Sequence, residues 1–492
     1  MTEYKLNPVK KVAVIGGGPC GVGVIRPLVE ENAFDEIVVF EKRDRTGGLW
    51  NYATEDFYSQ KHNVPSVDPS ELVKPYKIEN EKDNYWWPTA TYELLDANVP
   101  IELIGYKESE WADDMPIFPT RKQILDYFQD YAKPYEKYIK FGRNVISIRQ
   151  LDNLKWEITT RDVNDSTQGG FVESKESPDH VDLFDAVIVS SGSYDSPYIP
   201  DKEGLSAWNE KYPDSISHSK QYRHPRQFKD VKGEIIVVGN SASGSDISYQ
   251  IATELNRRLY KSARSKALLP DHVSSNLIVV PDIERLDPET KSVHFVDGTV
   301  VENVDKILFA TGFLRHYPFF KEINKSDKPL ITDGGRVHGT YRQVIGYNYP
   351  GLAFTFLARH TLPARLSQTQ GAWLARIFSG RLKLPTVEEM QQEEQDRLAK
   401  RGDGPAFHTL LFPDDVIYYK TFNKDIWGCG DKGYFPVEWN QQDIKYRGGS
   451  TALKEAYVKY INLTGEKPKS RKQIKETVGL EEPEIDFSIF DV

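Results

Sequence analysis

Two short apolar runs, each followed at once by a glycine-rich turn, stand out in the pattern of apolar and polar positions. Val12–Ile15 precedes Gly16–Gly21, and Ile235–Val238 precedes Gly239–Gly244. A short apolar run bounded by glycine is typical of a buried strand. If a helix begins after each turn, backbone N–H groups and the positive helix end face a pyrophosphate. The pattern therefore predicts two dinucleotide sites far apart in one chain.

The residues after the next predicted strand differ between the two sites. The strand Ile37–Phe40 ends in Glu41, the position where such folds place an acid on a ribose hydroxyl. A carboxylate there would repel a 2′-phosphate, so the first site suits FAD or NAD. The second site has no such acid, and its strand leads to Ser262, Arg264 and Lys266. A hydroxyl and two cations favour a phosphorylated ribose, so NADPH is expected there.

Other segments of the pattern predict further elements. Strands are expected at 186–189 and 307–309, with two more between 145 and 158. A helix is expected over 117–132, with Thr120 as its N-cap and Ile124, Leu125 and Phe128 on one face. The polar stretches 51–88 and 162–180 are expected to form an insertion and a hairpin tip.

These elements predict an α/β fold with two Rossmann-like dinucleotide-binding domains. Strands ending in glycine near residues 192 and 312 would carry the chain out of the first domain and back. The NADPH-binding domain, 203–311, is therefore expected to be inserted into the FAD-binding domain. The FAD-binding domain would comprise 1–202 and 312–492, the second part ending in a helical tail.

Composition excludes several other classes of protein. The 492 residues carry 63 Lys and Arg against 73 Asp and Glu, a formal net charge of −10 that gives no support to nucleic-acid binding. No apolar run approaches the roughly 20 residues of a membrane span, and no signal-peptide core is visible. A soluble cytoplasmic protein is expected. Cys20 and Cys429 alone exclude a disulfide scaffold, a cysteine zinc cluster and a C-x-x-C redox pair, and no metal site is expected.

Several motifs occur together along the chain. They are Gly47–Trp50, Tyr92–Pro100, Phe118–Arg121, Tyr212–Tyr222 with His218 inside it, Phe309–Phe313, and Gln370 within Ser367–Gln370. Together they resemble the flavin-containing monooxygenases, soluble fungal members in particular, over roughly residues 10–385. The chain departs from the family pattern at Tyr212, Asp214, Ala97 and Ser193, where the family has Phe, Gly, Thr and, in many members, His.

The resemblance implies a reaction. NADPH would reduce FAD, the reduced flavin would take up dioxygen at C4a, and the hydroperoxide would pass one oxygen to a soft nitrogen or sulfur nucleophile. The implied partners are dioxygen and a small-molecule amine, sulfide or thiol, with no nucleic acid and no membrane. Family members often form homodimers. A neutral amide suits the flavin's oxygen-reacting face, because it donates and accepts without adding charge. Asn98 is the candidate for that catalytic role.

The candidate site residues fall into two sets. The FAD set is Gly16, Gly18, Pro19, Cys20, Gly21, Glu41, Lys42, Gly48, Leu49, Trp50, Asn98, Val145 and Gln370. The NADP set is His218, Tyr222, Asn240, Ser241, Ala242, Ser243, Asp246, Ser262, Arg264 and Arg315. Asp246 is expected to cap the helix or to complement its dipole.

Simpler structural interpretations stay open for several of these residues. Asn98 could be a turn residue, and His218 is more readily explained by linker geometry than by proton transfer. Arg315 and Gln370 could both lie on the surface. Cys20 is interpreted as a small packing residue in the turn.

Other functions stay open as well. A Baeyer–Villiger monooxygenase, an N-hydroxylase and a non-oxygenating NADPH sensor would share both turns. A pyridine-nucleotide disulfide reductase would share them too, but the missing C-x-x-C pair argues against it.

Overall fold

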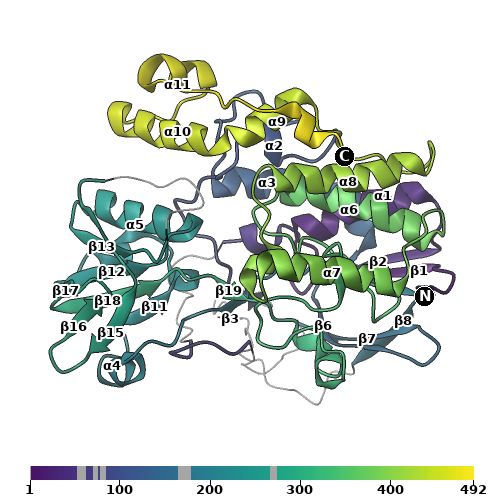
Figure 1. Cartoon of the computed structure of the whole chain (residues 1–492), viewed down its shortest axis with the longest axis horizontal. Coiled ribbons are helices and arrows are strands. Elements are labelled where there is room, and N and C mark those ends of the chain that lie inside the picture. The colour runs from purple at the N-terminus through teal and green to yellow at the C-terminus, as the bar shows by residue number, and fades with distance from the viewer. Residues whose placement is uncertain (1, 53–61, 70–75, 78–84, 164–178, 266–273) are drawn as a thin grey trace.

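The computed structural model describes residues 2–52, 62–69, 76–77, 85–163, 179–265 and 274–492. In this part of the chain two mainly parallel sheets lie side by side, and helices cover them (Figure 1). The larger sheet gathers strands from both ends of the chain, whereas the smaller sheet is formed from its middle.

The larger sheet has seven strands in the order β20-β21-β22-β9-β1-β2-β5. Their bounds are β1 Lys11–Ile15, β2 Glu36–Phe40, β5 Ile139–Lys140, β9 Ala186–Val189, β20 Thr340–Tyr341, β21 Ile345–Gly346 and β22 Leu352–Phe354. The strands from β22 to β5 run parallel, and β20 and β21 are antiparallel additions. The first apolar run is thus β1, with a parallel neighbour on each side.

The smaller sheet has five parallel strands in the order β11-β18-β12-β13-β14. Their bounds are β11 Ile216–His218, β12 Glu234–Val238, β13 Leu259–Ser262, β14 Leu277–Val280 and β18 Val304–Phe309. The second apolar run is the central strand β12. All five strands fall between β9 and β22 along the chain, so this unit is inserted into the larger one. The predicted fold class is confirmed.

The described residues form four smaller sheets as well, and three of them lie outside the chain crossings. They are the antiparallel β6 Arg143–Gln150, β7 Trp156–Asp162 and β8 His180–Phe184; β15 Ile283–Asp287, β16 Ser292–Phe295 and β17 Val300–Val301; and the pair β3 Tyr76–Lys77 and β4 Tyr85–Trp86. The two strands expected between 145 and 158 are therefore β6 and β7. Most of the hairpin tip expected at 162–180, and much of the insertion expected at 51–88, lies outside the described residues.

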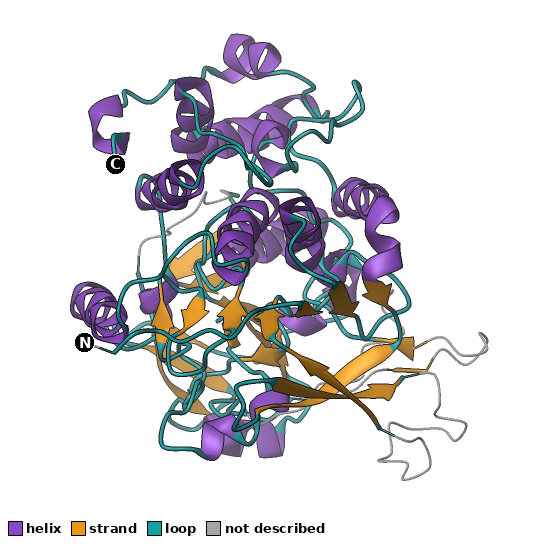
Figure 2. Cartoon of the chain, turned by 90° about the vertical axis from the view of Figure 1, so that its right-hand side faces the viewer, coloured by secondary structure: helices purple, strands orange, loops and turns teal. Residues whose placement is uncertain are grey.

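The α-helices are α1 Pro19–Glu31, α2 Ile101–Ile104, α3 Arg121–Ala132, α4 Leu205–Lys211, α5 Ala242–Glu254, α6 Pro363–Phe378, α7 Val387–Arg401, α8 Asp414–Gly428, α9 Gln441–Gly448, α10 Ser450–Thr464 and α11 Arg471–Val478. Most of them lie above the strands in the side view (Figure 2), whereas α4 lies below the smaller sheet in Figure 1. Helix α6 is buried along nearly its whole length, and it packs against α1 and α8. No helix formed by the described residues is both long and apolar enough to span a bilayer.

One expected helix begins later than predicted. The helix expected over 117–132 starts at Arg121, because Thr120 forms a capping box with Gln123 and Phe118 and Pro119 stay outside it. Thr120 is the N-cap, as predicted. Tyr127, rather than Leu125, joins Ile124 and Phe128 on the buried face.

The two chain crossings between the sheets lie side by side. β10 (Ser196–Pro197) pairs antiparallel with β19 (Phe313–Leu314). The Tyr198 amide donates to the carbonyl of Gly312 at 2.9 Å, and the Thr311 hydroxyl donates to the carbonyl of Tyr198 at 2.5 Å. The outgoing and returning segments therefore form a two-stranded connection.

The C-terminal helices reach both units. In Figure 1, α10 and α11 lie above α5 of the smaller unit, while α9 lies beside α2 of the larger one. The Tyr249 hydroxyl of α5 donates to the side chain of Asn462 on α10. At the other side of α10, Lys454 donates to the carbonyl of Ala97.

Candidate dinucleotide-binding sites

The first glycine turn brings backbone against backbone. It joins β1 to α1, whose N-cap is Gly18. Gly16 has a φ of +104°, a conformation that residues with side chains rarely adopt. A Cβ on Gly21 would lie 1.8 Å from the carbonyl oxygen of Gly16, so the helix passes too close to the strand for any side chain.

The second turn repeats this geometry between β12 and α5. Gly239 has a φ of +126°, and a Cβ on Gly244 would lie 2.2 Å from the carbonyl oxygen of Gly239. Ser241 occupies the N-cap of α5, and its hydroxyl makes no capping bond there. Gly18 has no side chain to cap α1. The first N–H groups of both helices are thus left available to an anion.

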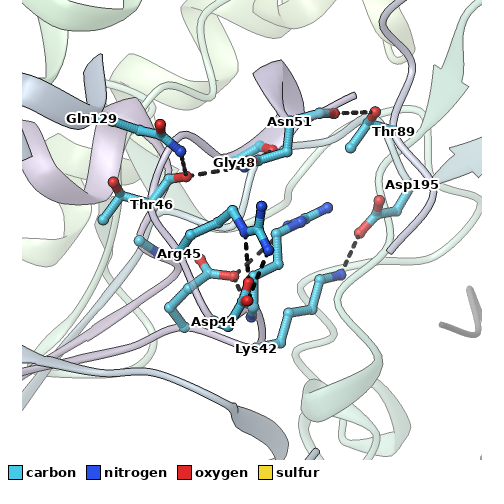
Figure 3. A network of polar contacts seen from close by, with 12 residues as sticks. Lys42, Asp44, Arg45, Thr46, Gly48, Asn51, Thr89, Gln129 and Asp195 are labelled. Atoms are coloured by element: carbon cyan, nitrogen blue, oxygen red, sulfur yellow. Dashed lines mark hydrogen bonds and ion pairs between the residues drawn. The ribbon is translucent and has the colours of Figure 1, made fainter. Parts of the chain in front are cut away.

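The Gly47–Trp50 segment closes over the first turn. Gly48 approaches so closely that a Cβ on it would lie 2.9 Å from the Cα of Gly18. Side chains fix the segment through its carbonyl groups (Figure 3). Asn51 donates to the carbonyls of Thr46 and Gly48, both at 3.0 Å, and Thr91 donates to the carbonyl of Leu49 at 3.1 Å. Leu49 and Trp50 therefore have a defined position beside the first turn.

Glu41 lies at the carboxyl end of β2, where an acid facing a ribose is expected. The residue is 3% exposed. Oε2 accepts from the N–H of Gly17 at 2.6 Å, and Oε1 accepts from the N–H of Arg43 at 2.8 Å. A carboxylate offers about four acceptor positions, so each oxygen can also accept from a ribose hydroxyl.

Lys42 is engaged by two other groups. Its ammonium group pairs with Asp195 at 3.2 Å and lies 4.2 Å from the ring centre of Trp87. Burial alone would raise the pKa of Asp195, but the charges of Lys42, Lys220 and Arg43 lower it below its usual range. Figure 3 shows Lys42 directed at Asp195. A direct bond from Lys42 to FAD stays a prediction.

Two other members of the FAD set contribute to packing, Val145 as a buried residue and Cys20 as a half-buried one. Val145 is buried in β6, in the same apolar cluster as Phe40 and Trp156. Burial raises the pKa of the Cys20 thiol to about 12, so this thiol stays protonated at neutral pH and is unsuited to nucleophilic chemistry. The geometry fits the packing role expected for Cys20.

Of the two cations predicted at the second site, Arg264 is exposed to solvent, and Lys266 lies outside the described residues. Asn240 donates to the carbonyl of Ser265 at 3.0 Å and so ties the second turn to the segment after β13. The Ser262 hydroxyl is buried and donates to the carbonyl of Pro281 at 2.8 Å, which differs from the phosphate contact expected for it. Arg264 is exposed, and no described residue pairs with its guanidinium group.

Asp246 does not act as a helix cap. It is the fifth residue of α5, beyond the first turn, so its carboxylate is past the free N–H groups. Instead it accepts from the Tyr92 hydroxyl at 2.5 Å and from the side chain of Gln250 at 3.0 Å. Gln250 in turn accepts from the Tyr222 hydroxyl at 2.9 Å. Asp246 and Tyr222 therefore belong to a contact between α5 and the segment that begins at Tyr92.

His218 is a neutral linker residue. Its Nδ1 accepts from the N–H of Lys220 at 3.1 Å, which leaves Nε2 to donate to the carbonyl of Gly312 at 2.9 Å. Burial, with a smaller contribution from His62, lowers the pKa of His218 to about 3. Both ring nitrogens are thus committed to the backbone, which fits linker geometry better than proton transfer.

Arg315 and Gln370 are buried, so the surface interpretation left open for each is wrong. Arg315 is 4% exposed and donates to the carbonyl of Leu357 at 2.6 Å. The Gln370 amide accepts from the N–H of Phe356 at 2.9 Å and donates to the Tyr418 hydroxyl at 3.2 Å. Both side chains hold the loop after β22 in place.

Asn98 differs from these residues because its side-chain amide has no hydrogen-bond partner among the described residues. It lies between two fixed backbone positions: the Ala97 N–H donates to the carbonyl of Pro119 at 2.9 Å, and the Ile101 N–H donates to that of Ile117 at 2.8 Å. Within the described part of the chain, no hydrogen bond engages the Asn98 side chain. The segment is therefore anchored while the amide keeps its full capacity for a ligand.

Two structural residues could not be found from the sequence. Phe356 has a φ of +59°, a strained backbone state that clusters at functional sites, and it lies at the carboxyl end of β22 beside Gln370. Arg223 is completely buried and donates to the carbonyls of Thr89, Thr91 and Lys220. Nothing in the local sequence signals either feature, because both depend on distant contacts.

Comparisons with known proteins identify the family of the chain. A family model described as flavin-binding monooxygenase-like matches residues 79–276 and 267–409. The flavin-containing monooxygenase FMO GS-OX3 of Arabidopsis thaliana is 29% identical over 400 residues, covering 78% of this chain and 77% of that protein. The flavin-containing monooxygenase ustF2 of Aspergillus flavus is 28% identical over 455 residues, covering 82% and 90%. The solved structure of S-allyl-L-cysteine S-oxygenase from Allium sativum has a similar fold, with a TM-score of 0.71, 21% identity and coverage of 95% and 97%.

Two of the glycines in the first turn should respond differently to alanine. Gly21→Ala should destabilise the FAD-free protein and lower FAD binding, because its Cβ collides with the backbone. Gly18→Ala meets no atom closer than 3.4 Å, so the FAD-free protein should keep its Tm. Its Cβ intrudes only where a pyrophosphate approaches, so FAD affinity should fall about tenfold, a loss of about 1.4 kcal/mol. Thermal melts and FAD titrations would check both. Wild-type FAD affinity in Gly18→Ala would place the pyrophosphate elsewhere.

Proposed function

The chain belongs to the flavin-binding monooxygenase-like family, and on that basis we propose that it transfers one oxygen atom of dioxygen to a soft nitrogen or sulfur nucleophile. The protein is an FAD-dependent monooxygenase whose cofactors are FAD and NADPH. Its substrate is proposed to be a small-molecule amine, sulfide or thiol.

The repeated turn geometry is the observation that carries this proposal. Both turns leave the first N–H groups of a helix uncapped and bring strand and helix too close for a side chain. Such a site accepts the two negative charges of a pyrophosphate. Two of them in one chain suit an enzyme in which one dinucleotide reduces another. FAD is assigned to the turn beside Glu41, and NADPH to the turn beside Arg264.

The chain's own residues supply position and polarity. The N–H groups at the start of α1 would bind the FAD pyrophosphate, and Glu41 would accept from the ribose. Leu49 and Trp50, fixed through Thr91 and Asn51, would border the flavin. When bound, reduced FAD supplies the oxygen chemistry, and the protein supplies orientation and a dry environment.

Asn98 is proposed to hold the reacting oxygen. Its amide can donate one hydrogen bond and accept another without adding charge. The backbone on both sides of Asn98 is fixed, so the amide would be preorganised and would cost little to reorganise during the reaction. His218 takes no part in proton transfer in this proposal, because both of its ring nitrogens are engaged.

A substrate panel tests the proposal most broadly. Amines, sulfides, thiols and a cyclic ketone would be supplied with NADPH and isotopically labelled dioxygen, and products would be identified by mass. The proposal predicts one labelled oxygen on nitrogen or sulfur. A labelled ester or lactone from the ketone alone would assign a Baeyer–Villiger reaction instead. NADPH consumption that never yields a labelled product would indicate a non-oxygenating flavoprotein.

Arg264 should set the preference for NADPH. A hydrogen bond from a charged group contributes about 1.5–3 kcal/mol, so Arg264→Ala should raise the KM for NADPH by roughly 10- to 150-fold. The KM for NADH should change little, because NADH lacks the 2′-phosphate. Arg258→Ala is a matched control, since Arg258 is also exposed but pairs with Glu234. Equal losses with NADPH and NADH would show that Arg264 is structural.

Asn98 should separate flavin reduction from oxygenation. In Asn98→Ala, NADPH should bleach the flavin absorbance at near the wild-type rate. One neutral hydrogen bond is worth about 1 kcal/mol, so the ratio of oxygenated product to hydrogen peroxide should fall about fivefold. The isosteric Asn98→Asp loses the same N–H donors and should shift that ratio in the same direction. If Asn98→Ala keeps the wild-type ratio, Asn98 is a turn residue only.

A further inference from the structure

A buried lysine of the C-terminal tail contacts the segment that carries Asn98. Lys454 lies on α10 and is 3% exposed. Its Nζ donates to the carbonyl of Ala97 at 2.7 Å and lies 4.6 Å from the ring centre of Phe118. Lysine is almost never this buried, because removing its charge from water is costly. Such a position calls for a specific reason.

Nearby carboxylates partly compensate the charge of Lys454. Burial lowers the pKa of Lys454, while the charges of Asp96 and Asp246 oppose that shift. Asp96 is also bound from the outer side by Lys467, whose Nζ lies 2.7 Å from its Oδ2. Asp96 further forms an isolated β-bridge with Thr120. The ammonium group of Lys454 therefore extends from α10 to the 96–98 segment, where the negative charges of Asp96 and Asp246 partly offset its own.

The bond to Ala97 bears directly on the geometry of Asn98. The carbonyl of Ala97 and the N–H of Asn98 belong to one planar peptide unit. The hydrogen bond from Lys454 to that carbonyl therefore also restrains the orientation of the peptide plane that leads to the Cα of Asn98. The Ala97 N–H is fixed separately by the carbonyl of Pro119. Lys454 thus supplies the remaining restraint on the peptide that directs the Asn98 side chain.

We propose that Lys454 is a positioning residue that orients Asn98 through the Ala97–Asn98 peptide, so that the C-terminal tail controls how efficiently the flavin site uses oxygen. This inference rests on the proposed oxygen-handling role of Asn98. Lys454 itself touches neither FAD nor substrate in this proposal. Its loss should therefore loosen Asn98 without changing the turns that bind the two dinucleotides.

The experiment compares Lys454→Met with Lys454→Gln in the FAD-loaded, full-length protein. Methionine and glutamine are both one atom shorter than lysine; methionine removes the donor altogether, whereas glutamine keeps a neutral N–H group that falls short of the Ala97 carbonyl. Lys459→Met is the matched control, because Lys459 lies on the same helix and is exposed. Flavin content and Tm establish that each variant is folded. If Lys454→Met does not retain FAD, Lys454→Gln decides the question.

Two readouts test positioning directly. Amide hydrogen exchange at Asn98, Val99 and Ile101 should accelerate about tenfold in both Lys454 variants, because a charge-assisted hydrogen bond that restrained local opening is lost. The ratio of product to hydrogen peroxide should fall, while NADPH still reduces the flavin at near the wild-type rate. Lys454→Arg, which keeps a charged donor, should restore most of the protection and most of the ratio. Lys459→Met should match the wild type.

The outcomes separate this inference from the proposed function. Wild-type exchange and a wild-type product ratio in Lys454→Met or Lys454→Gln would overturn the positioning role. The role would also be overturned if the Lys454 variants reduced the flavin more slowly while amide exchange at residues 98–101 stayed at the wild-type rate. If Asn98→Ala leaves the product ratio intact while Lys454→Met accelerates exchange, the oxygen-handling role of Asn98 fails and the structural contact stands.

Discussion

Direct contact between the first glycine after a strand and the start of the following helix occurs twice in this chain, and the proposed chemistry depends on it. At Gly21 and Gly244 no Cβ fits between helix and strand. This closeness directs the free N–H groups of α1 and α5 at the space beyond the strands. A side chain at either position would push the helix away and remove the anion site. In the proposed arrangement, the two dinucleotides would owe their place to the absence of side chains at these glycines rather than to particular polar groups.

The contacts between the two units, unlike the two turns, depend on the presence of particular side chains. Tyr92 reaches Asp246 of α5, and Arg223 binds three carbonyl groups of the segments around it. From the other side, Lys454 of the tail binds the Ala97 carbonyl. The short segment that carries Asn98 is thus connected to the larger unit, the smaller unit and the tail. These connections make the position of the segment depend on all three parts, which suits the proposed role of Asn98 at a site that uses both dinucleotides.

The sequence predicts the features that depend on local pattern. Both turns, the strand before each, the position of Glu41 and the cap at Thr120 follow from residue spacing alone. The errors involve residues whose partners are distant. Asp246 was expected to cap α5, but Tyr92 provides its bond. Gln370 lies on a helix with a polar sequence, yet α6 is buried because its arginines donate to carbonyl groups; Arg376, for example, bonds those of Tyr434 and Lys432. The periodicity of the sequence does not show that buried polar side chains will find hydrogen-bond partners on distant segments.

A crystal structure of the chain with FAD and NADP⁺ bound would test the central claim most directly. The account predicts that the pyrophosphate of FAD accepts hydrogen bonds from the N–H groups at the start of α1, and that of NADP⁺ from those at the start of α5. It also predicts the Asn98 amide within hydrogen-bonding distance of the flavin ring. A pyrophosphate bound away from either turn, or a flavin ring out of reach of Asn98, would contradict the account.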